Sequence, residues 1–212
     1  DAAYGGFFML TDRGRQAMRG IERAESITLD PHKGLFLPYG TGSLLVRDGS
    51  TLRKAHSVRA VYLPDTEHEP DLVDLSQVSP ELSRAFRGLR VWLPLKMHGI
   101  GPFQRNLEEK LQLAGWINAQ LREIEELEIV AEPQLTVLAF RLRLPGQDDA
   151  SINRLTRRLM DEVNARRRVY LSSTVIQGRF LVRICVLSFR THLERMQMAL
   201  EDIKAAVAKV VR

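Results

Sequence analysis

The stretch Ser26-Ile-Thr-Leu-Asp-Pro-His-Lys-Gly34 begins with side chains that alternate between polar and apolar, which is the period of a half-buried β-strand. Pro31 and Gly34 then indicate a turn directly after the strand. Lys33 therefore lies where its amine can point into a cleft. A lysine that is fixed in place and partly dry is suited to forming an imine with an aldehyde cofactor. A solvated lysine in an ordinary surface loop fits the same spacing, so spacing alone leaves both interpretations open.

The chain also resembles a known family at four places. Asp30-Pro-His-Lys33 and the upstream Asp1-Ala-Ala-Tyr-Gly-Gly6 are similar to the core of the group II pyridoxal-phosphate-dependent amino-acid decarboxylases, which include aromatic-amino-acid and glutamate decarboxylases. Phe86-Arg-Gly-Leu-Arg-Val-Trp92 resembles the segment that leads into the C-terminal domain of this family. Arg179-Phe-Leu-Val-Arg-Ile-Cys185 resembles its late strand. The four landmarks follow in the family's order and cover most of the 212 residues.

This resemblance implies an α/β fold. We expect the C-terminal part of a fold-type I pyridoxal-phosphate-dependent transferase large domain, followed by a small α+β C-terminal domain. Residues 1–90 are assigned to the large domain, including a mobile loop at 54–78, and residues 91–212 to the small domain. The loop carries Pro64, Pro70 and many charges without a sustained period, and loops of this length are usually functional or disordered.

Hydrophobic periodicity, caps and turn residues predict the individual elements. Strand, crossover and strand in the first half suggest an α/β layered domain, and the order αββαββα in the second half suggests helices covering an antiparallel sheet. Ser79 as N-cap and Pro80 at the first helical position predict a helix that runs to about Trp92. The other helices are expected at 9–21, 103–123, 151–165 and 191–211, and the strands at 26–29, 43–46, 127–131, 135–142, 169–175 and 180–187.

The family resemblance implies a role for each residue around the lysine. Lys33 would form the Schiff base with pyridoxal 5'-phosphate. Asp1 would hold the proton on the pyridine nitrogen through a charge-assisted hydrogen bond, and Ala3 would pack against the cofactor ring. His32 aligns with the histidine that contacts the cofactor phosphate, although a histidine beside a proline equally suits a surface turn. Asp30 replaces the asparagine of close animal relatives, and a carboxylate beside a phosphate is repulsive unless a cation or donor intervenes, so Asp30 is not assigned as a phosphate ligand.

Two tyrosines complete the expected site. Tyr62, in the 54–78 loop, matches the loop tyrosine that protonates Cα after decarboxylation in this family, and relatives with phenylalanine there tend to make aldehydes. An exposed loop tyrosine is the alternative interpretation. Tyr39 aligns with an aromatic position on the substrate side of the pocket. No metal is expected, because the remaining histidines have no ligand spacing.

Composition argues against several other classes of protein. The chain has 44% hydrophobic and 27% charged residues, which is ordinary for a soluble globular protein, and its apolar runs are far shorter than the ~20 residues of a membrane helix. The net charge is +5 and the pI about 9.6, but the arginines are dispersed apart from Arg166-Arg167-Arg168, which we interpret as a solvated helix end and not a nucleic-acid site. The single cysteine, Cys185, is expected to be a small buried strand residue in a cytoplasmic protein.

We therefore expect decarboxylation of an L-amino acid, with an aromatic substrate favoured over an acidic one, to give the amine and CO2. Asp1-Ala-Ala-Tyr4 resembles the end of a strand whose body is absent, so an N-terminal half, on the same or a separate polypeptide, is expected to complete the enzyme. The complete enzyme is expected to be a homodimer. Two alternatives stay open. The same cofactor can support aldehyde synthesis, transamination or another lyase step, and the chain as it stands can be a noncatalytic dimerisation fragment.

Overall fold

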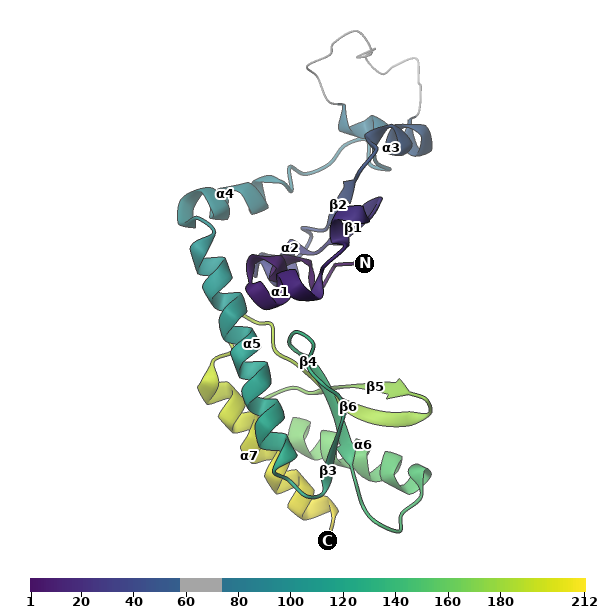
Figure 1. Ribbon diagram of the computed structural model, residues 1–212, viewed down its shortest axis with the longest axis vertical. Coiled ribbons are helices and arrows are strands. Elements are labelled where there is room, and N and C mark those ends of the chain that lie inside the picture. The colour runs from purple at the N-terminus through teal and green to yellow at the C-terminus, as the bar shows by residue number, and fades with distance from the viewer. Residues whose placement is uncertain (58–73) are drawn as a thin grey trace. The chain divides into compact units, whose positions relative to one another are not determined.

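The computed structural model describes residues 1–57 and 74–212 of the chain (Figure 1). The chain divides into two compact units. One unit comprises Asp1–Phe7 and Met18–Gly99, and the other comprises Phe8–Ala17 and Ile100–Arg212. None of the described helices combines the length and the apolar composition that a membrane-spanning segment needs.

The first unit is built on a two-stranded ribbon. Strands β1 (Ser26–Leu29) and β2 (Ser43–Val46) pair antiparallel, with Ser26 opposite Val46 and Leu29 opposite Ser43. Both strands lie where they were predicted. The pairing is antiparallel because the chain between the two strands turns back beside β1. That connection contains the short helix α2 (Pro31–Gly34), so Lys33 lies in a single helical turn at the end of β1.

Helix α3 (Gly49–His56) follows β2 because Asp48 caps it, its side chain accepting a hydrogen bond from the backbone N–H of Ser50. Residues 54–56, which we expected to open the 54–78 loop, therefore end a helix. At the far end of that segment Leu75–Gln77 form a 3-10 helix. Residues 58–73, which include Tyr62, lie outside the described residues.

The helix expected from Ser79 to Trp92 was predicted in the wrong place. Helix α4 runs from Leu89 to His98 and continues through Pro94. The hydroxyl of Ser79 does not cap a helix, because it donates to the carbonyl of Leu75 at 3.0 Å and accepts from Arg84. Arg84 also donates to the carbonyls of Leu75 and Glu81. The hydroxyl of Ser79 is thus engaged in contacts with neighbouring turns and is not available to cap a helix.

The helix expected at 9–21 is also shorter than predicted. A 3-10 helix covers Gly6–Leu10, and helix α1 covers only Asp12–Ala17. Thr11 separates the two, since its hydroxyl donates to the carbonyl of Phe8 at 2.7 Å and accepts from the N–H of Gly14 at 3.0 Å. Gly20, with φ of +94°, then takes the left-handed conformation that ends the segment.

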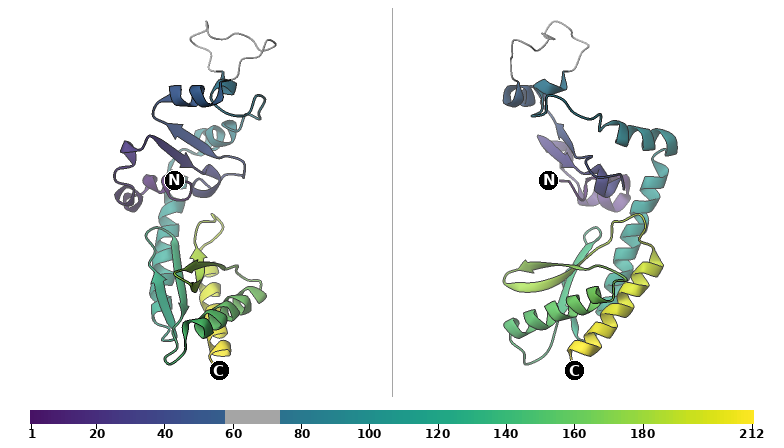
Figure 2. Two further views of the ribbon diagram at one scale, coloured as in Figure 1. Left: turned by 90° about the vertical axis from the view of Figure 1, so that its right-hand side faces the viewer. Right: turned by 180° about the vertical axis from the view of Figure 1, so that it is seen from behind.

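The second unit confirms the predicted αββαββα order. A four-stranded antiparallel sheet has the strand order β3-β4-β6-β5, and three long helices accompany it (Figures 1 and 2). The strands are β3 (Leu127–Ala131), β4 (Val137–Leu142), β5 (Ser172–Ile176) and β6 (Arg179–Cys185), and the helices are α5 (Gly101–Arg122), α6 (Asp149–Ala165) and α7 (Leu193–Val210).

One hydrophobic core holds this unit together. Helix α6 lies against β4, β6 and α7, and helix α5 lies along α7. Ile117, Leu138, Val182 and Ile203 bring one side chain each from α5, β4, β6 and α7 into the core, and all four are fully buried. Burial of such a side chain stabilises the fold by about 1.5–3 kcal/mol relative to an exposed one. Cys185 lies in β6 as predicted, but the expectation that it is buried was wrong, because alternation along the strand turns it to the exposed face.

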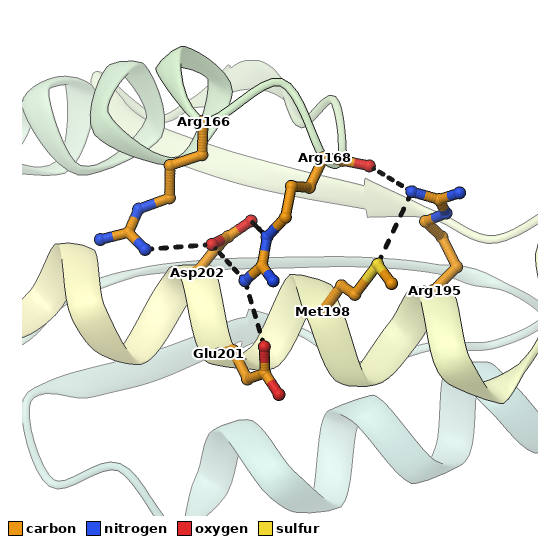
Figure 3. Close-up of polar contacts among 6 residues, drawn as sticks. All are labelled: Arg166, Arg168, Arg195, Met198, Glu201 and Asp202. Carbon is orange, nitrogen blue, oxygen red and sulfur yellow. Dashed lines mark hydrogen bonds and ion pairs between the residues drawn. The ribbon is translucent and has the colours of Figure 1, made fainter.

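The arginines that follow α6 contact α7 (Figure 3). Arg168 donates from Nη2 to Oδ1 of Asp202 at 2.7 Å, and Arg166 lies 3.2 Å from the same oxygen. The hydrogen bond from Arg168 to Asp202 raises the pKa of the guanidinium above its ordinary value despite desolvation, which lowers it. All three residues of Arg166-Arg167-Arg168 are exposed at the end of α6, as interpreted from the sequence, and Arg166 and Arg168 in addition neutralise the buried carboxylate of Asp202.

Candidate active site

The lysine turn is fixed by its own backbone. Asp30 precedes helix α2 in an extended conformation, and its carbonyl accepts hydrogen bonds from the N–H groups of Lys33 at 2.8 Å and Gly34 at 3.3 Å. Pro31 occupies the first turn, where a missing N–H costs nothing and a fixed φ favours the helix. Gly34 is required by close packing, since an added Cβ would lie 2.7 Å from Cβ of Phe7. The turn that carries the amine is thus tightly specified.

The amine of Lys33 is paired with a carboxylate. Its Nζ lies 2.8 Å from Oδ2 of Asp30, and Nε2 of His32 lies 3.6 Å from the same oxygen. The Lys33 side chain is 40% exposed, whereas the side chains of Asp30 and His32 are 22% and 15% exposed. An amine that is held at one point and still open to solvent on one side can react with a carbonyl compound that enters from that side.

The imidazole of His32 connects the lysine turn to the loop that follows it. Its ring lies 5.0 Å from the ring of Tyr39, centroid to centroid, at an angle of 35°. Nδ1 of His32 is buried, and none of the described residues forms a hydrogen bond with it. Tyr39 itself is 84% exposed, and its backbone carbonyl accepts a hydrogen bond from Arg90.

Phe36, between the lysine turn and Tyr39, has a φ of +58°. Such a value is rare for a bulky residue, and strained backbone of this kind concentrates at functional sites.

The first residues of the chain are attached to β1. The N–H of Ala2 donates to the carbonyl of Thr28 at 3.1 Å, and the hydroxyl of Thr28 donates to Oδ1 of Asp1 at 3.2 Å. The N–H of Ala3 donates to the same carboxylate oxygen at 2.9 Å. Asp1 and Ala2 are therefore attached to the strand whose end leads directly into Asp30 and Lys33, and Ala3 is held by the side chain of Asp1.

The structure thus gathers His32, Lys33 and Tyr39 on one segment and links Asp1 and Ala3 to the strand before it. Sequence reasoning gave no role to Asp30, which contacts both Lys33 and His32. The spacing permits this contact, since residues three apart face each other on a helical turn, but it equally permits a helix cap.

Comparison with known proteins identifies the family. The family model described as the pyridoxal-dependent decarboxylase conserved domain matches residues 1–143. The chain belongs to the pyridoxal-dependent decarboxylase family. The matched region of this decarboxylase-family chain contains the lysine turn, strand β1 before it and strand β2 after it. It also contains β3 and β4, the first two strands of the second unit.

Named relatives of this family member include an aromatic-L-amino-acid decarboxylase from Bacillus atrophaeus, which is 33% identical over 99% of the chain. The aromatic-L-amino-acid decarboxylase of Bos taurus is 28% identical over the whole chain. The chain spans 44% of the length of the Bacillus relative and 42% of the bovine one.

Solved structures with the same fold support this placement. The crystal structure of Oryza sativa TDC with PLP and tryptamine matches with a TM-score of 0.92 and 25% identity, covering 100% of this chain and 44% of that one. The tryptophan decarboxylase of Catharanthus roseus, crystallised with L-tryptophan, matches with a TM-score of 0.87 and 25% identity over 99% of this chain and 42% of its own. The decarboxylase-family chain therefore has the α/β fold of the C-terminal part of these proteins.

Proposed function

We propose that the complete protein is a pyridoxal-phosphate-dependent decarboxylase that converts an aromatic L-amino acid to the amine and CO2. The observation that carries this proposal is the half-open amine of Lys33, which Asp30 holds at 2.8 Å at the end of β1. This lysine lies within the region that matches the family model.

The residues present fit pyridoxal phosphate. Lys33 offers an amine that is reachable from solvent. Both hydrogen bonds that anchor Asp1 use Oδ1, which leaves Oδ2 for the N–H of a protonated pyridine ring. The buried Nδ1 of His32 is a polar atom without a partner among the described residues, as expected of a site that further groups complete. Ala3 adds little bulk beside Asp1, so a flat ring can approach.

Pyridoxal phosphate, when bound, supplies an electron sink that accepts the electron pair left on Cα when the substrate carboxylate departs as CO2. In the proposed assignment Lys33 holds the cofactor covalently through its amine. Asp1 keeps a proton on the ring nitrogen through a charge-assisted hydrogen bond, and Ala3 sets the plane of the ring. His32 contacts the phosphate, and Tyr39 lines the substrate side.

Tyr62 is proposed as the acid that delivers a proton to Cα, in a loop at 54–78 that excludes water during this step. The residue lies outside the described part of the chain, so this assignment rests on the family resemblance of Val61-Tyr-Leu-Pro64. A tyrosine at this place favours simple decarboxylation over aldehyde formation.

The proposed substrate class rests on the named relatives. The Bacillus and Bos taurus relatives are aromatic-L-amino-acid decarboxylases, and a Camptotheca acuminata relative is a tryptophan decarboxylase. A Drosophila melanogaster relative is a histidine decarboxylase, so a ring-bearing amino acid is the property that these relatives share.

We propose further that an N-terminal half completes the site, because the chain spans less than half the length of its relatives. In this proposal residues 1–90 are the end of the cofactor-binding domain and residues 91–212 the small C-terminal domain. The complete enzyme is proposed to be a cytoplasmic homodimer. The noncatalytic alternative predicts that the 212-residue chain binds no cofactor when the remaining half is absent.

The test uses the purified complete protein with pyridoxal phosphate and aromatic L-amino acids. We expect a visible absorbance band from lysine-linked cofactor, and after borohydride reduction a peptide that carries the cofactor mass on Lys33. Lys33→Ala should lose the band, the labelled peptide and the release of CO2. Lys96→Ala, which removes an exposed lysine of α4, should keep all three. A complete wild-type protein that links no cofactor would contradict the proposal.

A second measurement tests the acid. Tyr62→Phe should retain cofactor linkage but lose most amine output, with aldehyde appearing among the products. Chromatography of the products from wild type and variant gives the answer. Unchanged amine output in Tyr62→Phe would remove Tyr62 from the mechanism, and aldehyde as the main wild-type product would favour the aldehyde synthase alternative.

A further inference from the structure

We propose that Asp30 is a positioning residue that holds the side-chain nitrogen of Lys33 before and after the lysine is joined to its cofactor. This inference rests on the proposed function and adds a role that neither the family resemblance nor the relatives assign. Its basis is the contact of one carboxylate oxygen, Oδ2 of Asp30, with Nζ of Lys33 at 2.8 Å and Nε2 of His32 at 3.6 Å.

The rotamer of Asp30 distinguishes this contact from a routine helix cap. Four aspartates precede a helix in the described part of the chain. Asp48, Asp74 and Asp148 each accept a hydrogen bond from a backbone N–H of the first turn. Asp30 does not, although its backbone at φ −112° and ψ 93° is nearly that of Asp48 at −110° and 97°.

The difference lies in where the carboxylate points. An aspartate in this conformation is well placed to cap a helix, and capping normally stabilises the helix. Asp30 instead directs its carboxylate to the lysine amine and the histidine ring. Its backbone carbonyl meanwhile accepts from the N–H of Lys33, so main chain and side chain of Asp30 both hold the lysine.

Charge balance gives the contact a function. A carboxylate beside an anionic cofactor is unfavourable unless a cation or a hydrogen-bond donor intervenes, and the structure places the Lys33 amine and the His32 ring against the carboxylate of Asp30. The nitrogen of a lysine joined to an aldehyde can still carry a proton and a positive charge. The carboxylate of Asp30 remains in place to hold that charged nitrogen by a charge-assisted hydrogen bond. Asp30 thus favours retention of the cofactor without contacting its phosphate.

The experiment compares the complete protein with Asp30→Asn and Asp30→Ala. After loading with pyridoxal phosphate, each protein is diluted, and the visible band of lysine-linked cofactor is followed over time, with borohydride reduction and mass spectrometry of the Lys33 peptide at each point. We expect both variants to lose cofactor about tenfold faster or more, since a hydrogen bond to a charged group is removed. Asp30→Asn should lose it more slowly than Asp30→Ala, because the amide oxygen still accepts a hydrogen bond.

Asp48→Asn is the matched control, since it alters an aspartate of the same backbone conformation that contacts no lysine amine in the described structure. It should retain cofactor like the wild type. The thermal midpoint of the cofactor-free protein should be the same in wild type and Asp30→Asn, which separates positioning from general destabilisation. If Asp30→Asn loses cofactor at the same rate as the wild type or more slowly, the inference is overturned. Failure of the wild type itself to link cofactor would instead overturn the proposed function.

Discussion

Asp202 and Arg168 lie 2.7 Å apart, from Oδ1 to Nη2, with the aspartate side chain fully buried and the arginine 39% exposed (Figure 3). The contact joins α7 to the segment that follows α6. Arg166 adds a second contact to the same carboxylate, so the buried charge is neutralised from two sides. A buried carboxylate without such partners would strongly destabilise the folded chain.

Asp202→Ala should lower the free energy of unfolding by about 1–3 kcal/mol, because the variant loses hydrogen bonds to charged groups and leaves a small cavity. Urea unfolding of the purified chain measures this change. Glu201→Ala is the control, since Glu201 contacts the same Arg168 at 3.1 Å but is 66% exposed. It should change stability little, as exposed ion pairs generally do. Equal effects of the two substitutions would contradict a special contribution from the buried carboxylate.

Glu109 gives a prediction about acid stability. Burial raises the pKa of Glu109, but hydrogen bonds from Lys110 and His192 outweigh burial and bring the pKa below its ordinary 4.5. A folded-state pKa below the unfolded one means that the carboxylate stabilises the fold fully above about pH 4.5, and that this contribution is lost as pH falls through the lower folded value. Lys110 is fully buried and donates to Glu109 at 2.7 Å.

Glu109→Gln should therefore reduce stability near neutral pH and flatten the loss of stability below about pH 4.5. Unfolding free energies measured at a series of pH values test both parts. Glu123→Gln, at the exposed end of the same helix, should leave the pH profile as in wild type. If Glu109→Gln loses stability below about pH 4.5 as steeply as the wild type does, other carboxylates dominate the loss of stability in acid.

Gly34 links packing to the candidate site. Gly34→Ala would place a Cβ 2.7 Å from Cβ of Phe7, so one of the two segments has to move. Overpacking of this kind costs about 1–3 kcal/mol. We expect lower stability together with reduced cofactor linkage at Lys33 in the complete protein. In the control Gly49→Ala the new Cβ meets nothing within 4 Å, and stability should be maintained or slightly raised. Thermal unfolding measures the change in stability, and borohydride reduction followed by mass spectrometry of the Lys33 peptide measures the change in cofactor linkage.

The elements of the second unit were predictable because their signals are local. The 22-residue helix α5 shows apolar spacing over several turns, and Asp148 caps α6 within the same short segment. Helix α4 was misplaced for the opposite reason. Whether Ser79 caps a helix depends on Arg84 and on the carbonyl of Leu75, which the pattern of apolar residues does not encode.

The candidate site also has features that local sequence predicts and one feature that depends on side-chain contacts. Lys33 and its turn follow from Pro31 and Gly34, and the resemblance to the family supplies the chemistry. The role of Asp30 does not follow, because an aspartate before a helix can either cap it or pair with a lysine three residues on. Only the observed rotamer decides between these two, and it decides for Lys33.

The hairpin between β5 and β6 offers a stabilising substitution. Gln177 and Gly178 connect the paired residues Ile176 and Arg179, and both have positive φ, 51° and 76°. A two-residue hairpin with positive φ at both positions is a type I′ turn, which prefers Asn-Gly, whereas glutamine tolerates the left-handed region poorly. Gln177→Asn should raise the free energy of unfolding by about 0.5 kcal/mol, within the range typical of such backbone-matched changes. Gln177→Val should lower it, because a β-branched residue is strained at positive φ. Urea unfolding of the two variants beside the wild type tests the turn, and stabilisation by valine would contradict the assigned conformation.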